Sequence, residues 1–225
     1  MKNLMLIFSL IFSGTLSAQN VILSKVKKMS DNTDKIFYKI NPSETEAEYL
    51  GELEIQGFSD NDEEVFGKIY KKAKEIGANA FSYQPFESID GTTNNFDTSH
   101  YRLNLYYLPK DQFPKEENTI YIISSAAKSQ KISLNNEIIE LQPRTFTKRT
   151  LDFGVVYSLS TRKLLGSTIK LSAKQEQDVR YFQVSSAKIR TNQDGTPGIN
   201  LKSGDIIALE RSYGEFLTTI YQQIK

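Results

Sequence analysis

The residue types that most often carry out chemistry are scarce in this chain of 225 residues. It contains no cysteine and one histidine, His100. A hydrolytic triad would need a serine nucleophile beside that histidine, but no Gly-x-Ser-x-Gly motif occurs, because Ser13-Gly14 and Ser203-Gly204 lack the flanking glycine. We therefore expect His100 to be an ordinary residue of a loop or a strand start. The absence of cysteine excludes any thiol-based role.

Four acidic residues gather in one short segment, namely Asp60, Asp62, Glu63 and Glu64. They could offer oxygens to calcium, but the segment lacks the glycine and the regular ligand spacing of a calcium loop. Asp60 precedes Glu63 by three residues, which is the spacing of a capping box, and acids stabilise the positive end of a helix. We favour the capping interpretation. We expect no catalytic, cofactor-binding or metal-binding residues, with a carboxylate-based hydrolase as an open alternative.

The acidic segment belongs to a strand–helix–strand unit at residues 49–83. Residues 49–58 alternate between apolar and polar side chains, as in a half-buried strand. A helix should begin at Asp60, because apolar residues then recur at three- and four-residue spacing until Gly77 supplies the left-handed stop. Residues 78–83 form a second strand. A strand–helix–strand connection favours parallel pairing of the two strands.

The segments around this unit complete a first domain at residues 19–109. The basic run at residues 25–28 is interpreted as a solvated segment that leads into the fold, and residues 36–40 as a short strand. Residues 84–98 form a long polar loop, which is either a partner surface or a solvated hairpin loop. Residues 100–108 alternate again and form the strand that closes this domain.

Two motifs in this domain carry a family resemblance. Tyr-Leu-Gly-Glu-Leu-Glu at 49–54 and Lys-Ala-Lys-Glu-Ile-Gly-Ala-Asn-Ala at 72–80 follow a short strand closed by Asn41-Pro42. Over residues 35–108 the chain resembles YbjQ-like and RcsF-like small bacterial envelope domains. The resemblance implies a compact ββαβ-type domain that assembles with or contacts partners and has no established active site. The chain lacks the cysteines that RcsF-like domains use for disulfides, and YbjQ-like domains have been described as metal binders.

The sequence pattern changes after a linker at residues 110–117, which includes Pro114. Nine short strands with turn signals between them indicate an antiparallel β-sandwich at residues 118–225. Asn135-Asn136 has the chemistry of a two-residue hairpin turn. Residues 215–224 show helical spacing and predict a terminal helix docked on the sandwich, with a terminal strand as the competing interpretation. The strands are expected at 119–124, 131–134, 137–141, 144–148, 152–159, 167–173, 179–185, 187–191 and 205–209.

The first 18 residues have the order of a secretory signal peptide. Lys2 is their only charge, the apolar run at 4–12 is too short to span a bilayer, and Ser17-Ala18 gives a small-residue cleavage site. Removing them takes one base from 28 basic and 27 acidic residues. The resulting neutral balance gives no electrostatic reason to expect nucleic acid or an anionic membrane as a partner.

The sequence therefore predicts an α+β protein with a small α/β domain, an antiparallel β-sandwich and a C-terminal helix. The second domain resembles small exported bacterial β-sandwich domains, which implies binding or scaffolding. We expect an exported envelope protein, periplasmic or extracellular, that binds another envelope protein or itself without catalysis. The alternatives are a carrier of a small ligand or peptide in an inter-domain cleft, and the hydrolase. An apolar, roomy cleft would favour the carrier, and an exposed sheet edge the scaffold.

The predicted signal peptide leads to the first testable prediction. Mass spectrometry of the purified envelope fraction should find a mature chain that begins at or near Gln19. An intact Met1 recovered in the membrane pellet would contradict cleavage.

Overall fold

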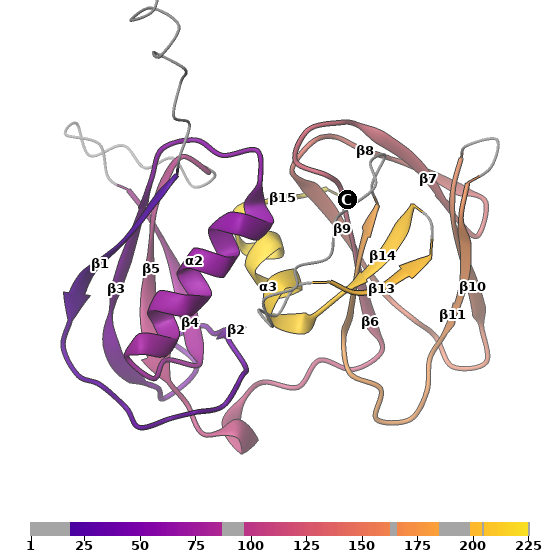
Figure 1. The fold of residues 1–225 in the computed structure, drawn as a ribbon. Helices are drawn as coiled ribbons and strands as arrows, with labels where there is room; N and C mark the ends of the chain where they lie inside the picture. Colours follow the sequence, from indigo (N-terminus) through magenta and orange to yellow (C-terminus); the bar gives the residue numbers. More distant parts are fainter. Residues whose placement is uncertain (1–18, 87–96, 163–165, 185–198, 204, 225) are drawn as a thin grey trace, which may run out of the picture.

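The computed structural model describes residues 19–86, 97–162, 166–184, 199–203 and 205–224, with side chains undescribed for 199–203. Two lobes lie side by side, with one helix between them (Figure 1). The predicted α+β class is confirmed, since a mixed α/β lobe is followed by a sandwich-like region and a C-terminal helix.

The first lobe is a five-stranded sheet with helix α2 (Asp62–Glu75) packed on one face (Figure 1). The strand order is β1-β3-β5-β4-β2. Strand β5 lies between β3 and β4 and is antiparallel to both, so β3 and β4 run parallel as expected but are not paired with each other. Strand β2 pairs with β4 in parallel at the edge of this sheet. The strands are β1 (Asn20–Val26), β2 (Tyr38–Lys39), β3 (Glu48–Gln56), β4 (Ala80–Pro85) and β5 (His100–Tyr107).

The basic run is exposed as expected, but Lys25 and Val26 also belong to the edge strand β1, and Lys27 and Lys28 follow it. Val21 and Leu23 pair with Ile55 and Leu53 of β3, which places them on the face that packs against the core. The lysines obscured this alternation in the sequence, because a β-bulge between Leu23 and Lys25 breaks the period of two. The strand expected at 36–40 is shorter than predicted and covers only β2.

Helix α2 begins one residue later than the capping pattern suggested. The N-cap is Asn61, whose side chain accepts a hydrogen bond from the Glu64 backbone N–H at 3.3 Å, so the expected Asp60–Glu63 pair is wrong. The Asn61 backbone N–H donates to Oγ of Ser59 at 3.1 Å and not to Glu64, so the return bond of a capping box is not formed. Gly77 has φ +75°, and a Cβ there would lie 1.9 Å from the Ser30 carbonyl oxygen. The predicted glycine stop is confirmed.

The second lobe consists of two packed sheets. One has the order β11-β10-β7-β8 and the other β13-β14-β12-β6-β9-β15. Their facing side chains form a common core that includes Ile122, Leu134, Leu159 and Phe182. Most pairs are antiparallel as expected, but β6 with β12 and β9 with β15 are parallel. The bounds are β6 (Thr119–Ile123), β7 (Gln130–Leu134), β8 (Glu137–Leu141), β9 (Thr145–Thr150), β10 (Val156–Thr161), β11 (Thr168–Ser172), β12 (Arg180–Val184), β13 (Ile199–Ser203), β14 (Ile206–Leu209) and β15 (Gln222–Gln223).

Most predicted strands of this lobe are present with small shifts. Asn135 and Asn136 have φ of 49° and 75° and join β7 to β8, which confirms the hairpin turn. Residues 152–155 form a turn, so the strand expected from residue 152 begins only at Val156. Arg144 is also in the left-handed region, at φ 55°, and lies outside β9. The strand expected at 187–191 falls outside the described residues.

The terminal helix α3 (Arg211–Ile220) begins and ends four residues earlier than the predicted helix. The Glu210 carboxylate caps it by accepting from the Ser212 N–H at 2.8 Å, a cap that the expectation overlooked. The chain then enters β15, so the competing strand interpretation holds for two residues.

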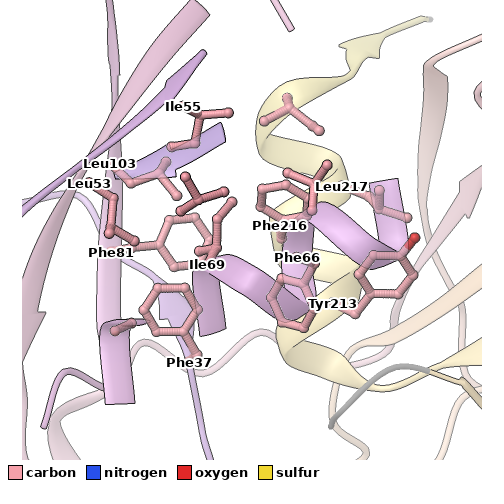
Figure 2. Packing of buried hydrophobic residues seen from close by; sticks show 14 of the residues in the cluster. Phe37, Leu53, Ile55, Phe66, Ile69, Phe81, Leu103, Tyr213, Phe216 and Leu217 are labelled. Atoms are coloured by element: carbon pink, nitrogen blue, oxygen red, sulfur yellow. The ribbon is translucent and has the colours of Figure 1, made fainter. Parts of the chain in front are cut away.

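Helix α3 packs on the first lobe as well as on the sandwich. The ring of Phe66 on α2 lies 5.3 Å from Phe216 and 5.2 Å from Tyr213, centroid to centroid (Figure 2). These residues belong to one buried cluster that also includes Leu53 of the first sheet and Ile207 of the second lobe. The two lobes therefore share a core. The chain crosses between them through a short 3₁₀ turn at Lys110–Gln112, and the division into two domains stays a prediction.

Gly214 generates a prediction about this shared core. A Cβ at Gly214 would lie 2.2 Å from Cγ of Tyr181, so Gly214→Ala must displace either the ring or the helix. Overpacking of this kind costs about 1–3 kcal/mol, or about 2–4 °C in Tm per kcal/mol at this size. Differential scanning calorimetry should show that loss.

The matched control is Thr218→Ala on the same helix, whose hydroxyl bonds only to helix carbonyl oxygens. It should change stability by less than about 0.5 kcal/mol. Equal Tm values for the wild type and Gly214→Ala would show that α3 does not approach Tyr181 this closely.

Candidate functional site

The junction between the lobes contains a buried ion pair. Asp62, the first residue of α2, is only 6% exposed. One of its carboxylate oxygens accepts from Nη2 of Arg144 at 3.1 Å, and the other accepts from the Tyr221 hydroxyl at 2.5 Å. Three elements that are distant in sequence thus meet at one carboxylate: the start of α2, the β8–β9 turn and the residue after α3.

Arg144 extends this contact to the loops of the first lobe. Its Nη1 donates to Oγ1 of Thr98 at 2.9 Å, and its Nη2 also donates to the Ser59 carbonyl oxygen. The positive φ of Arg144 turns the chain just before β9 begins. We call Asp62, Arg144 and Tyr221 the junction triad. Its contacts orient one lobe on the other.

Burial changes the pKa values of Asp62 and Tyr221 in the junction triad. Burial raises the pKa of the Asp62 carboxyl above its ordinary value of 3.8, and the Arg144 guanidinium and the Tyr221 hydroxyl oppose that shift. Burial and the Asp62 charge also raise the pKa of Tyr221 well above 10.0. Tyr221 therefore stays protonated and can donate to Asp62 at neutral pH.

A cavity of about 200 Å³ lies beside the junction triad. Its polar lining comes from the N-terminal end of α2, from Gln183 on β12 and from two tyrosines at or after α3. The residues that matter below are Asp60, Asp62, Glu63, Gln183, Tyr213 and Tyr221. We call this space the α2 cavity.

A second cleft of about 260 Å³ lies along α3, and its charged groups are largely paired with each other. Lys148 bonds to Glu116 at 2.6 Å, and Arg211 bonds to Glu215 at 2.7 Å. The Glu215 carboxylate also accepts from the Lys39 backbone N–H at 2.6 Å. A cleft lined by such pairs is neither apolar nor a set of free carboxylates.

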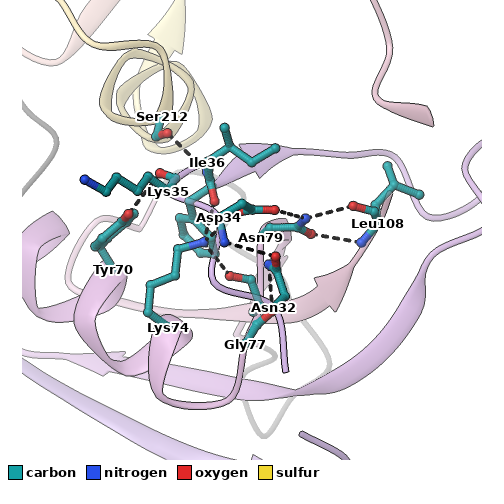
Figure 3. A network of polar contacts seen from close by, with 12 residues as sticks. Asn32, Asp34, Lys35, Ile36, Tyr70, Lys74, Gly77, Asn79, Leu108 and Ser212 are labelled. Atoms are coloured by element: carbon teal, nitrogen blue, oxygen red, sulfur yellow. Dashed lines mark hydrogen bonds and ion pairs between the residues drawn. The ribbon is translucent and has the colours of Figure 1, made fainter. Parts of the chain in front are cut away.

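The motif Gly-Ala-Asn-Ala, on which the family resemblance rests, forms a structural network (Figure 3). Asn79 is fully buried, donates to Asp34 and to the Leu108 carbonyl oxygen at 2.8 Å each, and accepts from the Leu108 N–H at 2.9 Å. Lys74 donates to Asp34 at 3.2 Å and to the Ile36 carbonyl oxygen at 2.6 Å. These groups bind one another, which leaves this network little capacity for a ligand.

His100 is the first residue of β5, which confirms the strand-start expectation. Its Nε2 lies 3.3 Å from the Glu54 carboxylate, and its ring stacks on Phe86 with centroids 3.6 Å apart. In the described part of the chain, no serine or threonine hydroxyl bonds to the His100 ring. The geometry therefore offers His100 no nucleophile to activate.

The acidic segment divides into residues with different surroundings. Glu64 is exposed and pairs with Lys68 at 2.7 Å, whereas Asp62 is buried in the junction triad. Within the described ranges, no group of three or more potential ligands is placed to hold a metal ion.

Of the expected loop at 84–98, residues 84–85 belong to β4, Thr98 contacts Arg144, and residues 87–96 lie outside the description. Gly204 also lies outside it.

Residues 152–159 were expected to form one strand, but they begin with a turn whose apolar side chains are exposed. Phe153 is 68% exposed and Val156 60%, and Val155 is exposed between them. The turn is well defined, because the Tyr157 hydroxyl donates to the Asp152 carboxylate at 2.7 Å and Gly154 takes φ +79°. We call residues 153–156 the apolar tip. Only the Phe153-Gly154 pair in the sequence hinted at a turn there.

The apolar tip adjoins a sheet edge that has no neighbouring strand among the described residues. Val156 pairs with Ser172 of β11, and β11 is the terminal strand of its sheet. The Thr161 N–H bonds to the Ser167 carbonyl oxygen, so alternation places the ladder bonds to β10 at Ile169 and Leu171. The backbone groups of Thr168, Lys170 and Ser172 then point outward, although the Ser172 carbonyl oxygen already accepts from Nη2 of Arg180 at 3.3 Å. We call this the β11 edge.

Comparisons with known proteins do not assign this arrangement to a family. No family model, curated protein or solved structure matches the chain. Among the described residues, no helix has both the length and the apolar character needed to cross a bilayer.

The junction triad generates a pH prediction. Because the raised pKa makes folded Asp62 hold its proton more tightly than the unfolded chain does, its contribution to the free energy of unfolding falls as pH rises above 3.8 through the folded pKa. Urea unfolding from acid to neutral pH should show the wild type losing stability relative to Asp62→Asn over that window. A relative gain with rising pH would mean that the Arg144 ion pair outweighs burial.

Proposed function

We propose that this chain is an exported, non-enzymatic binding module of the bacterial envelope, which captures an extended segment of another protein at the β11 edge. Export rests on the leader-like first 18 residues. Binding rests on the open edge and the apolar tip beside it.

The carrying observation is that the apolar tip lies at the end of β11 where Val156 pairs with Ser172. An unpaired strand edge is a template for strand addition, and the backbone bonds it offers give affinity without sequence preference. Exposed apolar side chains in a well-defined turn add specificity, because little conformational entropy is lost when they bind. Phe153 and Val156 would contact the incoming segment where it passes the Ser172 end of β11.

The edge also favours a particular partner chemistry. Lys170 is exposed on the outer face of β11, and a lysine on an edge strand disfavours uncontrolled pairing. A partner segment with an acidic residue opposite Lys170 and an apolar residue near Phe153 would complement both features. Because acidic and basic residues are nearly balanced in the chain, selectivity would depend on this local pairing.

The clefts between the lobes do not fit a carrier of an apolar ligand or a peptide. Both are small, and both are lined with charged groups. A carrier of an apolar ligand or peptide would need a larger apolar groove.

The test uses Lys170→Pro, with Lys170→Ala as the matched control. Proline removes the outward N–H of residue 170 and leaves the bonds from Ile169 and Leu171 to β10 in place. A photo-crosslinking residue at Thr168, which is exposed, should trap one envelope protein in cells. Lys170→Pro should abolish that adduct and Lys170→Ala should retain it, at similar Tm.

Phe153→Ser serves as a second variant that leaves the edge backbone unchanged. It should weaken the adduct, whereas Ile138→Ser, at an exposed position of β8, should not. An adduct that persists in Lys170→Pro, or one made only of two copies of this chain, would overturn the proposal.

A further inference from the structure

We propose that the α2 cavity binds a small ligand through a protonated primary amine. The site uses no residue of the β11 edge or the apolar tip, so it is independent of the function proposed above.

The size of the α2 cavity permits a ligand larger than one water molecule. It measures about 200 Å³, and one water needs roughly 10–15 Å³ by the same kind of measure. Ala126 and Ala127 also line it and give an apolar surface beside the polar groups. An amine with a short hydrocarbon chain would use both kinds of surface.

The negative charge of the cavity lining is only partly compensated. Arg144 and Tyr221 neutralise and bond Asp62. Asp60 and Glu63 have no cation partner within the described residues, and Oε1 of Glu63 is shielded from solvent without a hydrogen-bond donor. Burial raises the pKa of Glu63, the response expected of a carboxylate that lacks a compensating charge.

A second and independent observation comes from Tyr213. It is only 3% exposed and lines the α2 cavity, and its hydroxyl makes no hydrogen bond to any described residue. Figure 2 shows its ring beside Phe66, with the oxygen directed away from the packed rings. Burial raises the pKa of Tyr213 well above 10.0, so the hydroxyl stays neutral and its oxygen can accept a hydrogen bond.

Gln183 adds a further acceptor. It is 8% exposed and lines the cavity, and its amide Nε2 donates to the Ser124 carbonyl oxygen at 3.3 Å, whereas its Oε1 accepts no hydrogen bond from a described residue. The free side-chain groups of the lining are therefore mainly acceptors: the carboxylates of Asp60 and Glu63, the Tyr213 hydroxyl and the Gln183 carbonyl. An ammonium group carries three donors, no acceptor and the opposite charge, so it complements this set.

Calorimetric titration with n-butylamine tests this inference, with n-butanol as the neutral probe of the same shape. The amine should bind at least about tenfold more tightly than the alcohol, since a charged hydrogen bond contributes about 1.5–3 kcal/mol and about 1.4 kcal/mol corresponds to tenfold. Glu63→Gln should weaken amine binding about tenfold, and Tyr213→Phe should weaken it several-fold.

Glu64→Gln is the matched control, because Glu64 lies on the same helix but is paired with Lys68 and does not line the cavity. It should leave amine binding unchanged. Equal binding of amine and alcohol, equal effects of Glu63→Gln and Glu64→Gln, or no amine binding at millimolar concentration would each overturn the proposal. Preferential binding of calcium or inorganic phosphate over the amine would also overturn it.

Discussion

The burial of α3 between two sheets is the constraint on which the rest of the structure depends. Its residues satisfy groups of the first lobe directly: the Ser212 hydroxyl accepts from the Phe37 N–H at 3.1 Å, and the Glu215 carboxylate accepts from the Lys39 N–H. Because β2 has only two residues, it depends on these bonds as well as on β4. On its other side the helix approaches Tyr181 so closely that only glycine fits at position 214. The last elements of the chain thus complete the first lobe.

A helix between two sheets fills the central space but leaves gaps along its sides. Both cavities at the junction are lined by residues of α3 or its end, among them Tyr213 in one and Thr218 in the other. Apolar packing at the centre is non-directional and would tolerate sliding of one lobe on the other. The junction triad removes that freedom, because a buried carboxylate that lost its partners would be left uncompensated at a cost of about 3–5 kcal/mol. The polar junction therefore specifies orientation, while the rings supply most of the stability.

The sequence pattern predicted the features that depend on residues close together in the chain. The helix face, Gly77 and the Asn135-Asn136 turn could be predicted, because each depends on residues a few positions apart. The N-cap was misplaced by one residue, since Asn61 and Asp60 are both good caps and only the geometry distinguishes them. The junction triad could not be predicted. Asp62 and Tyr221 lie 159 positions apart, and an acidic residue at a helix start already has a sufficient local explanation.

The open strands of this fold differ in how they are protected, and that difference singles out one of them. The edge strand β1 carries a β-bulge and Lys25, and β8 presents Glu137 and Glu140, which pair with Arg149 and Lys131. Bulges and charges of this kind discourage a further strand. The β11 edge has Lys170 but no bulge in its pairing with β10, and the apolar tip adjoins one end. The β11 edge has regular pairing, one charged residue and an apolar turn at one end. Such an edge disfavours pairing with most strands but favours a strand with the complementary acidic and apolar residues. That selectivity is expected of a binding surface, whereas an edge evolved only to avoid aggregation would gain nothing from an exposed phenylalanine in a well-defined turn.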